Sequence, residues 1–369
     1  MPLTTELADR RSVLAGWFAT RLPDTTAAAA DLAAVVKHRP TARPYHDGPI
    51  DWPTIGRAIG QRIALAVQAA PPYYALRGAA NLINDPEWAH RAARQFPTHS
   101  RTPAGSVNDV RPLPNGGWLR LATTTVNPAT VNPATANPAT ANVSARTRRP
   151  RMTSPVDELL SRLVAYLAMR APAGSIGAPG VERKLARVCW ALAQFEAAYR
   201  TGVVPDQLRD LPSMSVDDLL GMAPEYAVRD LTTLAGMAGE RLLPAIASAG
   251  TALTAPVFVD GWADADILAG RCLIDVKATI HPTAARPDWF YQLLGYAWLD
   301  ADDRYGIESV ALYLARQGAY VEWSITRLAR LLGAELPVAA LAAEFRDIAP
   351  TTSSWPAGNR WVTNALGHR

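Results

Sequence analysis

Two neighbouring segments of the sequence carry acidic and basic residues at a spacing that could do metal chemistry. Residues 257–268 and 272–279 alternate between apolar and polar types in the manner of β-strands, and Gly270-Arg271 lies between them. A two-residue loop of this kind predicts a β-hairpin. The pattern therefore brings the polar residues of the two segments onto one face of a strand pair.

Counted from that turn, Asp266 is expected to lie opposite Asp275, and Asp264 opposite Lys277. Facing carboxylates repel each other across a strand pair, and a buried charge without a partner costs several kcal/mol. The two aspartates therefore need a cation between them. Carboxylate oxygens are ligands that hard divalent ions prefer, so we predict a site for a hard divalent cation.

A helix and two further strands follow the hairpin in the sequence. Asp288 is a plausible N-cap, and Gln292 and Tyr296 lie four residues apart, which places them on one face of the helix. Residues 306–315 and 319–325 then have the pattern of strands around a turn. The predicted order is helix, strand, strand, helix, strand, strand.

These motifs resemble the PD-(D/E)xK nuclease superfamily, in its RecB-like branch. The resemblance covers residues 225–330, less than a third of the chain, and implies an α/β fold with a restriction-endonuclease-like core, a mixed sheet flanked by helices. It also implies a metal-dependent enzyme that hydrolyses phosphodiester bonds. The matching residues are Asp264 and Asp266, the Asp275-Val276-Lys277 triplet, and Gln292 with Tyr296.

The resemblance implies a role for each of the metal-binding residues. Asp266 and Asp275 would bind Mg²⁺ or Mn²⁺, and the carbonyl of Val276 would be a further ligand. Asp264 is a rival for the first metal position, because it stands two residues before Asp266.

The remaining roles concern the attacking water and the substrate. Lys277 would orient or activate the water and stabilise the charge of the phosphorane. Gln292 and Tyr296 would position the backbone or the substrate strand. The family also has an acidic residue or histidine on the helix that precedes the hairpin, for which Glu225 and Glu240 are the alternatives.

Other interpretations of the same residues remain open at the level of the sequence. Asp264 and Lys277 could form an ordinary cross-strand ion pair, and the domain could be a noncatalytic nucleic-acid-binding or assembly module on the same fold. Ser175 lies in an Ala-Gly-Ser-Ile-Gly segment, but a serine hydrolase would need a strand before it and a histidine beside it.

The rest of the chain divides at a repeat of Asn-Pro-Ala-Thr. Residues 1–125 are predicted to be a mostly helical N-terminal region of unknown role, a candidate site for DNA or a protein partner. Residues 126–152 form a proline-rich linker that ends in arginines. A helical approach and the nuclease-like domain occupy residues 153–349, and residues 350–369 form a C-terminal tail.

Composition narrows the class of protein. The net charge of +4 is only a weak indication of nucleic acid as partner, and no apolar run predicts a membrane segment or a signal peptide. We therefore expect a cytoplasmic protein with no membrane partner, and the resemblance implies that it acts on nucleic acid, in the first place DNA. Of 37 basic residues only Lys37, Lys184 and Lys277 are lysines, so Lys277 in an apolar strand is an unusual choice.

Overall fold

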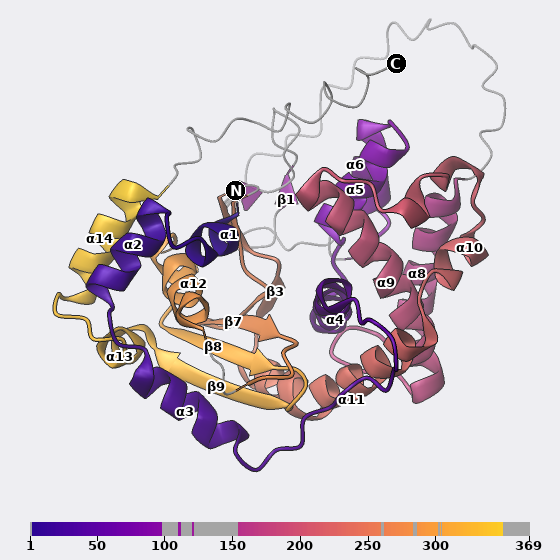
Figure 1. The fold of residues 1–369 in the computed structure, drawn as a ribbon. Coiled ribbons are helices and arrows are strands. Elements are labelled where there is room, and N and C mark those ends of the chain that lie inside the picture. Colours follow the sequence, from indigo (N-terminus) through magenta and orange to yellow (C-terminus); the bar gives the residue numbers. More distant parts are fainter. Residues whose placement is uncertain are drawn as a thin grey trace, which may run out of the picture.

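The computed structural model describes residues 2–97, 154–259, 262–282, 286–301, 303 and 305–349, together with the strand backbone at 110–111 and 120–121. A mixed five-stranded sheet with helices on both sides forms the centre of the structure (Figure 1). This confirms the predicted α/β class and the helical N-terminal region. The strand order is β3 (Ala252–Thr254), β6 (Ile267–Ala269), β7 (Cys272–Lys277), β8 (Ser309–Leu314) and β9 (Ala319–Ser324).

The β6–β7 hairpin has the predicted register. Ile267 pairs with Ile274 and Ala269 pairs with Cys272, so the loop consists of the two residues Gly270 and Arg271. Gly270 has φ 56°, a left-handed conformation that glycine adopts without steric cost. Strand β7 then pairs in parallel with β8 through the crossover helix α12 (Pro287–Trp298), and β9 returns antiparallel to β8.

The prediction of one continuous strand over residues 257–268 is wrong. Two short strands in this segment form a separate two-stranded sheet, in which Val257 pairs with Asp264. Trp262 is buried at the turn between them, and its carbonyl accepts a hydrogen bond of 2.7 Å from the amide of Leu3. The strands are β4 (Val257–Val259) and β5 (Ala263–Asp264). Residues 263–264 thus pair with β4 and do not continue the β6–β7 ladder.

Alternation along the strands gives the sheet two apolar faces, each covered by helices. In β7, Leu273 belongs to one core and Ile274 to the other. The core on the Leu273 side contains α12 together with α1 (Leu3–Ala8), α2 (Val13–Arg21), α3 (Thr26–Val36), α13 (Ile325–Leu331) and α14 (Val338–Ile348). The core on the Ile274 side contains α4 (Trp52–Val67), α5 (Tyr73–Leu82), α6 (Pro86–Ala93), α8 (Pro155–Arg170), α9 (Pro179–Thr201), α10 (Val216–Gly221) and α11 (Glu225–Ser248).

Local sequence signals define the long helices of the second core. Ser154 and Asp157 form a capping box at the start of α8, and Gly202, with φ 69°, ends α9. Helices α5 and α9 approach so closely that a Cβ atom on Gly78 would lie 1.9 Å from the carbonyl oxygen of Phe195. The 3₁₀ turns Asp206–Leu208 and Leu211–Ser213 connect α9 to α10.

The N-terminal helices belong to the same cores as residues 154–349. Helices α1–α3 lie against α12, α13 and β9, whereas α4 and α5 pack on α9 (Figure 1). The linker at 126–152 and the tail at 350–369 lie outside the described residues, and β1 (Val110–Arg111) pairs with β2 (Arg120–Leu121). None of the helices in the described part of the chain is long and apolar enough to cross a membrane.

Shared cores predict the behaviour of a chain cut at the linker. A protease site inserted within residues 126–152 should allow cleavage into two fragments that still elute together in gel filtration, because Phe18 and Ile59 are buried in cores completed by residues 154–349. Urea should separate the fragments, as a control for complete cleavage. Two fragments that separate in native buffer, each folded by circular dichroism, would contradict this packing.

Candidate metal centre

The predicted site residues of β7 lie at its C-terminal end, beneath α12. Asp275 and Lys277 alternate with Val276, so both face the same side of the sheet as Leu273, toward α12. The side chain of Asp275 is only 5% exposed, whereas that of Lys277 is 20% exposed. The alternation therefore buries the carboxylate and leaves the ammonium at the edge of the site.

Gln292 joins the two charged residues. Its Nε2 donates hydrogen bonds of 2.9 Å to Asp275 Oδ1 and 3.0 Å to Tyr296 Oη, and its Oε1 accepts a hydrogen bond of 2.9 Å from Lys277 Nζ. The predicted four-residue spacing thus places Gln292 and Tyr296 together. Lys277 Nζ also lies 2.9 Å from Asp275 Oδ2, which closes a ring of three side chains.

One oxygen in this ring is left without a hydrogen bond. Asp275 Oδ2 is buried, and the nearby ammonium of Lys277 is at ion-pair distance but does not meet it with hydrogen-bond geometry. Buried carboxylate oxygens are normally satisfied by donors or by a cation. Asp275 Oδ2 is therefore the atom of this site that is available to a further cation.

Asp266 reaches the same place from the turn before β6. Its Oδ2 accepts a hydrogen bond of 2.7 Å from the amide of Val276. Because the N–H and C=O of one strand residue point to the same side, the carbonyl of Val276 also faces Asp266. The predicted ligands Asp266, Asp275 and the Val276 carbonyl thus converge on the end of the hairpin.

The proximity of the two carboxylates has an electrostatic effect. Burial and the charge of Asp275 raise the pKa of Asp266 to about 7, although the hydrogen bond from Val276 and the charge of Lys277 act in the opposite direction. Burial, together with the neighbouring carboxylates, also raises the pKa of Tyr296 well above its usual value. The phenol is thus held neutral beside a concentration of negative charge.

Asp264 is not opposite Lys277, and the prediction of that pair is wrong. Because Asp264 lies in β5, which pairs with β4, its carboxylate points to α9 and accepts hydrogen bonds of 3.3 and 2.7 Å from Arg200. Glu196 accepts a third hydrogen bond from the same guanidinium, at 2.6 Å. Arg200 was missed in the sequence because only its i,i+4 relation to Glu196 is local, while Asp264 is 64 residues away.

The helix before the hairpin, α11, does not complete the site in the way that the family pattern implies. Glu225 forms ion pairs with Arg183 and Arg187, and Glu240 is exposed. Among the described residues no group of three or more His, Cys, Asp or Glu side chains is arranged to hold a metal ion.

The donors that are present nevertheless fit a hard divalent ion. They are carboxylate oxygens of Asp266 and Asp275 and one backbone carbonyl, and Asp275 Oδ2 is the one of them that accepts no hydrogen bond. Mg²⁺ commonly keeps several waters and takes only one or two carboxylates from a protein. Two carboxylates are therefore sufficient for such an ion at the end of β7.

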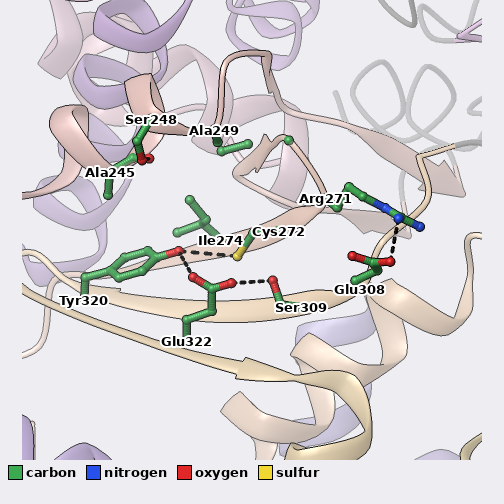
Figure 2. Close-up of a pocket in the computed structure, with 12 residues that line it drawn as sticks. Ala245, Ser248, Ala249, Arg271, Cys272, Ile274, Glu308, Ser309, Tyr320 and Glu322 are labelled. Atoms are coloured by element: carbon green, nitrogen blue, oxygen red, sulfur yellow. Dashed lines mark hydrogen bonds and ion pairs between the residues drawn. The ribbon is translucent and has the colours of Figure 1, made fainter.

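A cavity of about 410 Å³ opens at the other end of β7 (Figure 2). It is lined in part by Cys272, Ser309, Tyr320 and Glu322, and contains none of the predicted site residues. Its two carboxylates are already satisfied, since Glu322 accepts hydrogen bonds of 2.5 Å from Ser309 and 2.9 Å from Tyr320, and Glu308 forms an ion pair with Arg271. We assign no chemistry to this cavity.

The raised pKa of Asp266 predicts how stability depends on pH. The folded chain keeps a proton up to about pH 7, whereas the unfolded chain loses it near 3.8, so this contribution to stability disappears as pH rises through 7. In EDTA, the melting temperature of the wild type should fall more between about pH 5 and about pH 8 than that of Asp266→Asn. Equal falls in the two proteins would contradict the assignment.

Comparison with known proteins adds nothing to this geometry. No protein-family model matches the chain, and no curated protein or solved structure matches it either. What the site can do must therefore be inferred from its own residues.

Proposed function

We propose that this chain is a metal-dependent nuclease that hydrolyses phosphodiester bonds, in the first place in DNA, through a PD-(D/E)xK-type site. The observation that carries the proposal is the convergence of Asp266, Asp275 and Lys277 at the end of one hairpin. The order of elements supports it, since α11 precedes the β6–β7 hairpin, and α12 crosses to the parallel strand β8. This order agrees with a restriction-endonuclease-like core.

Asp266, Asp275 and the carbonyl of Val276 would hold Mg²⁺ or Mn²⁺. When bound, the ion would supply charge neutralisation at the phosphate and a lower pKa for the attacking water. Both carboxylates are already held in position, Asp266 by the amide of Val276 and Asp275 by the amide of Gln292. Ligands fixed in this way bind an ion with little further loss of side-chain entropy.

Lys277 is suited to stabilise the charge that develops on the phosphate. Its ammonium is a compact donor on a flexible stem, and its Nζ is oriented by Gln292 while its side chain remains 20% exposed. A donor that is held in place before the reaction lowers the barrier without further reorganisation. Gln292 and Tyr296 make their hydrogen bonds within the protein, so we assign them the positioning of Asp275 and Lys277 rather than contact with substrate.

A second candidate function is a noncatalytic DNA-binding module. The observation that favours it is the ion pair between Lys277 and Asp275, which neutralises one carboxylate without any metal, in a site with no described group of three metal-binding side chains. In that case the same fold would bind DNA in EDTA and would not cut it when Mg²⁺ is added.

Substitution of the lysine separates the two candidates. Under single-turnover conditions with Mg²⁺, the wild type should cleave a labelled DNA duplex, and EDTA should stop this cleavage. Lys277→Arg should cut roughly 100-fold more slowly, about 2.7 kcal/mol, because the planar guanidinium cannot replace the compact ammonium at the phosphate.

The matched control is Asp264→Asn, which changes a neighbouring carboxylate that binds Arg200 and not the proposed ion. This variant should retain much of the activity, with its melting temperature recorded alongside. Full cleavage activity in Lys277→Arg would contradict the catalytic role assigned to Lys277. The absence of cleavage by the wild type, with DNA still bound, would favour the noncatalytic module.

A further inference from the structure

Helix α4 runs past the proposed site, and its first turn is held beside the end of β7. The ring of Trp52 lies 5.0 Å from the guanidinium of Arg316. Arg316 in turn donates a hydrogen bond of 2.9 Å to the carbonyl of Ala278, the residue after Lys277. The N-terminal end of α4 is therefore anchored next to the ammonium of the site.

The other end of α4 is held beside Asp266. Gln68, the residue that caps the helix, accepts a hydrogen bond of 3.2 Å from the amide of Thr254. The next residue, Ala255, donates a hydrogen bond of 2.8 Å to the carbonyl of Asp266. Thus α4 extends from one side of the carboxylate pair to the other.

One face of α4 is directed toward the site. Arg57, Gln61 and Gln68 are separated by four and seven residues, which places them in one row along the helix. Gln68 contacts the strand next to Asp266, and Gln61 donates a hydrogen bond of 2.7 Å to Glu196, the partner of Arg200. Arg57 lies in this row, between the two ends of α4 that contact the residues around the site.

Arg57 has no carboxylate partner in the described part of the chain. Its Nε is buried without a hydrogen bond, and its one hydrogen bond, of 3.3 Å, goes from Nη2 to the hydroxyl of Thr54. Burial lowers the pKa of Arg57, and so does the charge of Arg200, while the charges of Glu196 and Asp51 oppose that effect. An arginine that folding partly desolvates without pairing is costly, which indicates a partner outside the chain.

The helix surface next to Arg57 is bare. Gly56 and Gly60 are four residues apart, and a Cβ atom built on either would have no neighbour within 4 Å. These glycines leave room for another molecule to approach the backbone of α4 beside the unpaired guanidinium. Arg57 and this bare surface together make a place for an anion on the helix whose two ends contact the segments that carry Lys277 and Asp266.

The geometry points to Arg57 as a binding residue for the sugar–phosphate backbone of DNA that lies across Asp266 and Asp275. The outer N–H groups of a planar guanidinium match the oxygens of a phosphodiester, and Gly56 and Gly60 carry no side chain that would obstruct the strand. This inference rests on the proposed function, because it takes DNA as the ligand of the site. It gives the helical region before the linker a part in substrate binding.

The affinity for DNA, measured in EDTA, tests the role of Arg57 without any need for cleavage. With a labelled 20-base-pair DNA duplex, fluorescence anisotropy should show affinity about fivefold or more lower for Arg57→Gln than for wild type. The slope of log affinity against log salt concentration should become shallower by about 0.9, the value for one lost phosphate contact. Arg57→Lys should recover part of the affinity, because it keeps the charge.

The matched control is Arg209→Gln, which removes the same charge from a side chain that is 70% exposed and paired with Asp206. Its affinity should stay within twofold of wild type. The melting temperature of Arg57→Gln should be unchanged or higher, because the substitution removes a desolvated charge. Affinity equal to that of the control, or affinity lost together with a lowered melting temperature, would overturn the inference.

The two proposals can fail separately in this design. A wild type that binds DNA through Arg57 and does not cut it with Mg²⁺ would end the nuclease proposal and leave this inference standing. A wild type that cuts, with Arg57→Gln binding as tightly as Arg209→Gln, would end this inference alone.

Discussion

A charge that folding removes from water must find a partner inside the protein, and this constraint organises the structure around the end of β7. Arg62 of α4 forms a buried ion pair with Glu182 of α9, and Arg316 of the β8–β9 turn forms one with Asp230 of α11. Arg200 joins α9 to β5 through Asp264. These pairs fix helices α4, α9 and α11 relative to one another and to the sheet. The carboxylates at the end of the β6–β7 hairpin lie within the framework that these elements form.

Three groups meet this rule only in part, and they are the ones that we connect with function; Asp275 pairs with Lys277 but keeps one oxygen without a hydrogen bond. Asp275 Oδ2 is buried without a hydrogen bond, Asp266 has a pKa near 7, and Arg57 is partly buried without a carboxylate partner among the described residues. They stand out in a molecule whose arginines Arg62, Arg316 and Arg200 are all paired. A cation at the carboxylates and a phosphate at the guanidinium would offset the cost on both sides. The carboxylates and the arginine are then two halves of one binding site, contributed by the sheet and by α4.

The sequence predicts the contacts between residues that are close together in the chain, and it does not predict those between distant residues. The β6–β7 register follows from a two-residue turn, and the contact of Gln292 with Tyr296 follows from helical spacing, so both were predicted. The partner of Asp264 could not be predicted, because Asp264 belongs to β5, which pairs with β4, and its partner Arg200 is 64 residues away in the sequence. The position of α1–α3 on the sheet likewise depends on packing between residues hundreds of positions apart. An amphipathic pattern predicts that a helix has a buried face, but not which surface that face packs against.

Titration calorimetry tests directly whether Asp266 and Asp275 form the cation site. Mn²⁺ should bind the wild type and Asp264→Asn with similar affinity, because Asp264 is engaged by Arg200. Asp275→Asn should bind at least tenfold more weakly, about 1.4 kcal/mol, because it removes the charge of the unbonded carboxylate oxygen. Equal affinity in Asp275→Asn and wild type, or loss of binding in Asp264→Asn alone, would contradict the account.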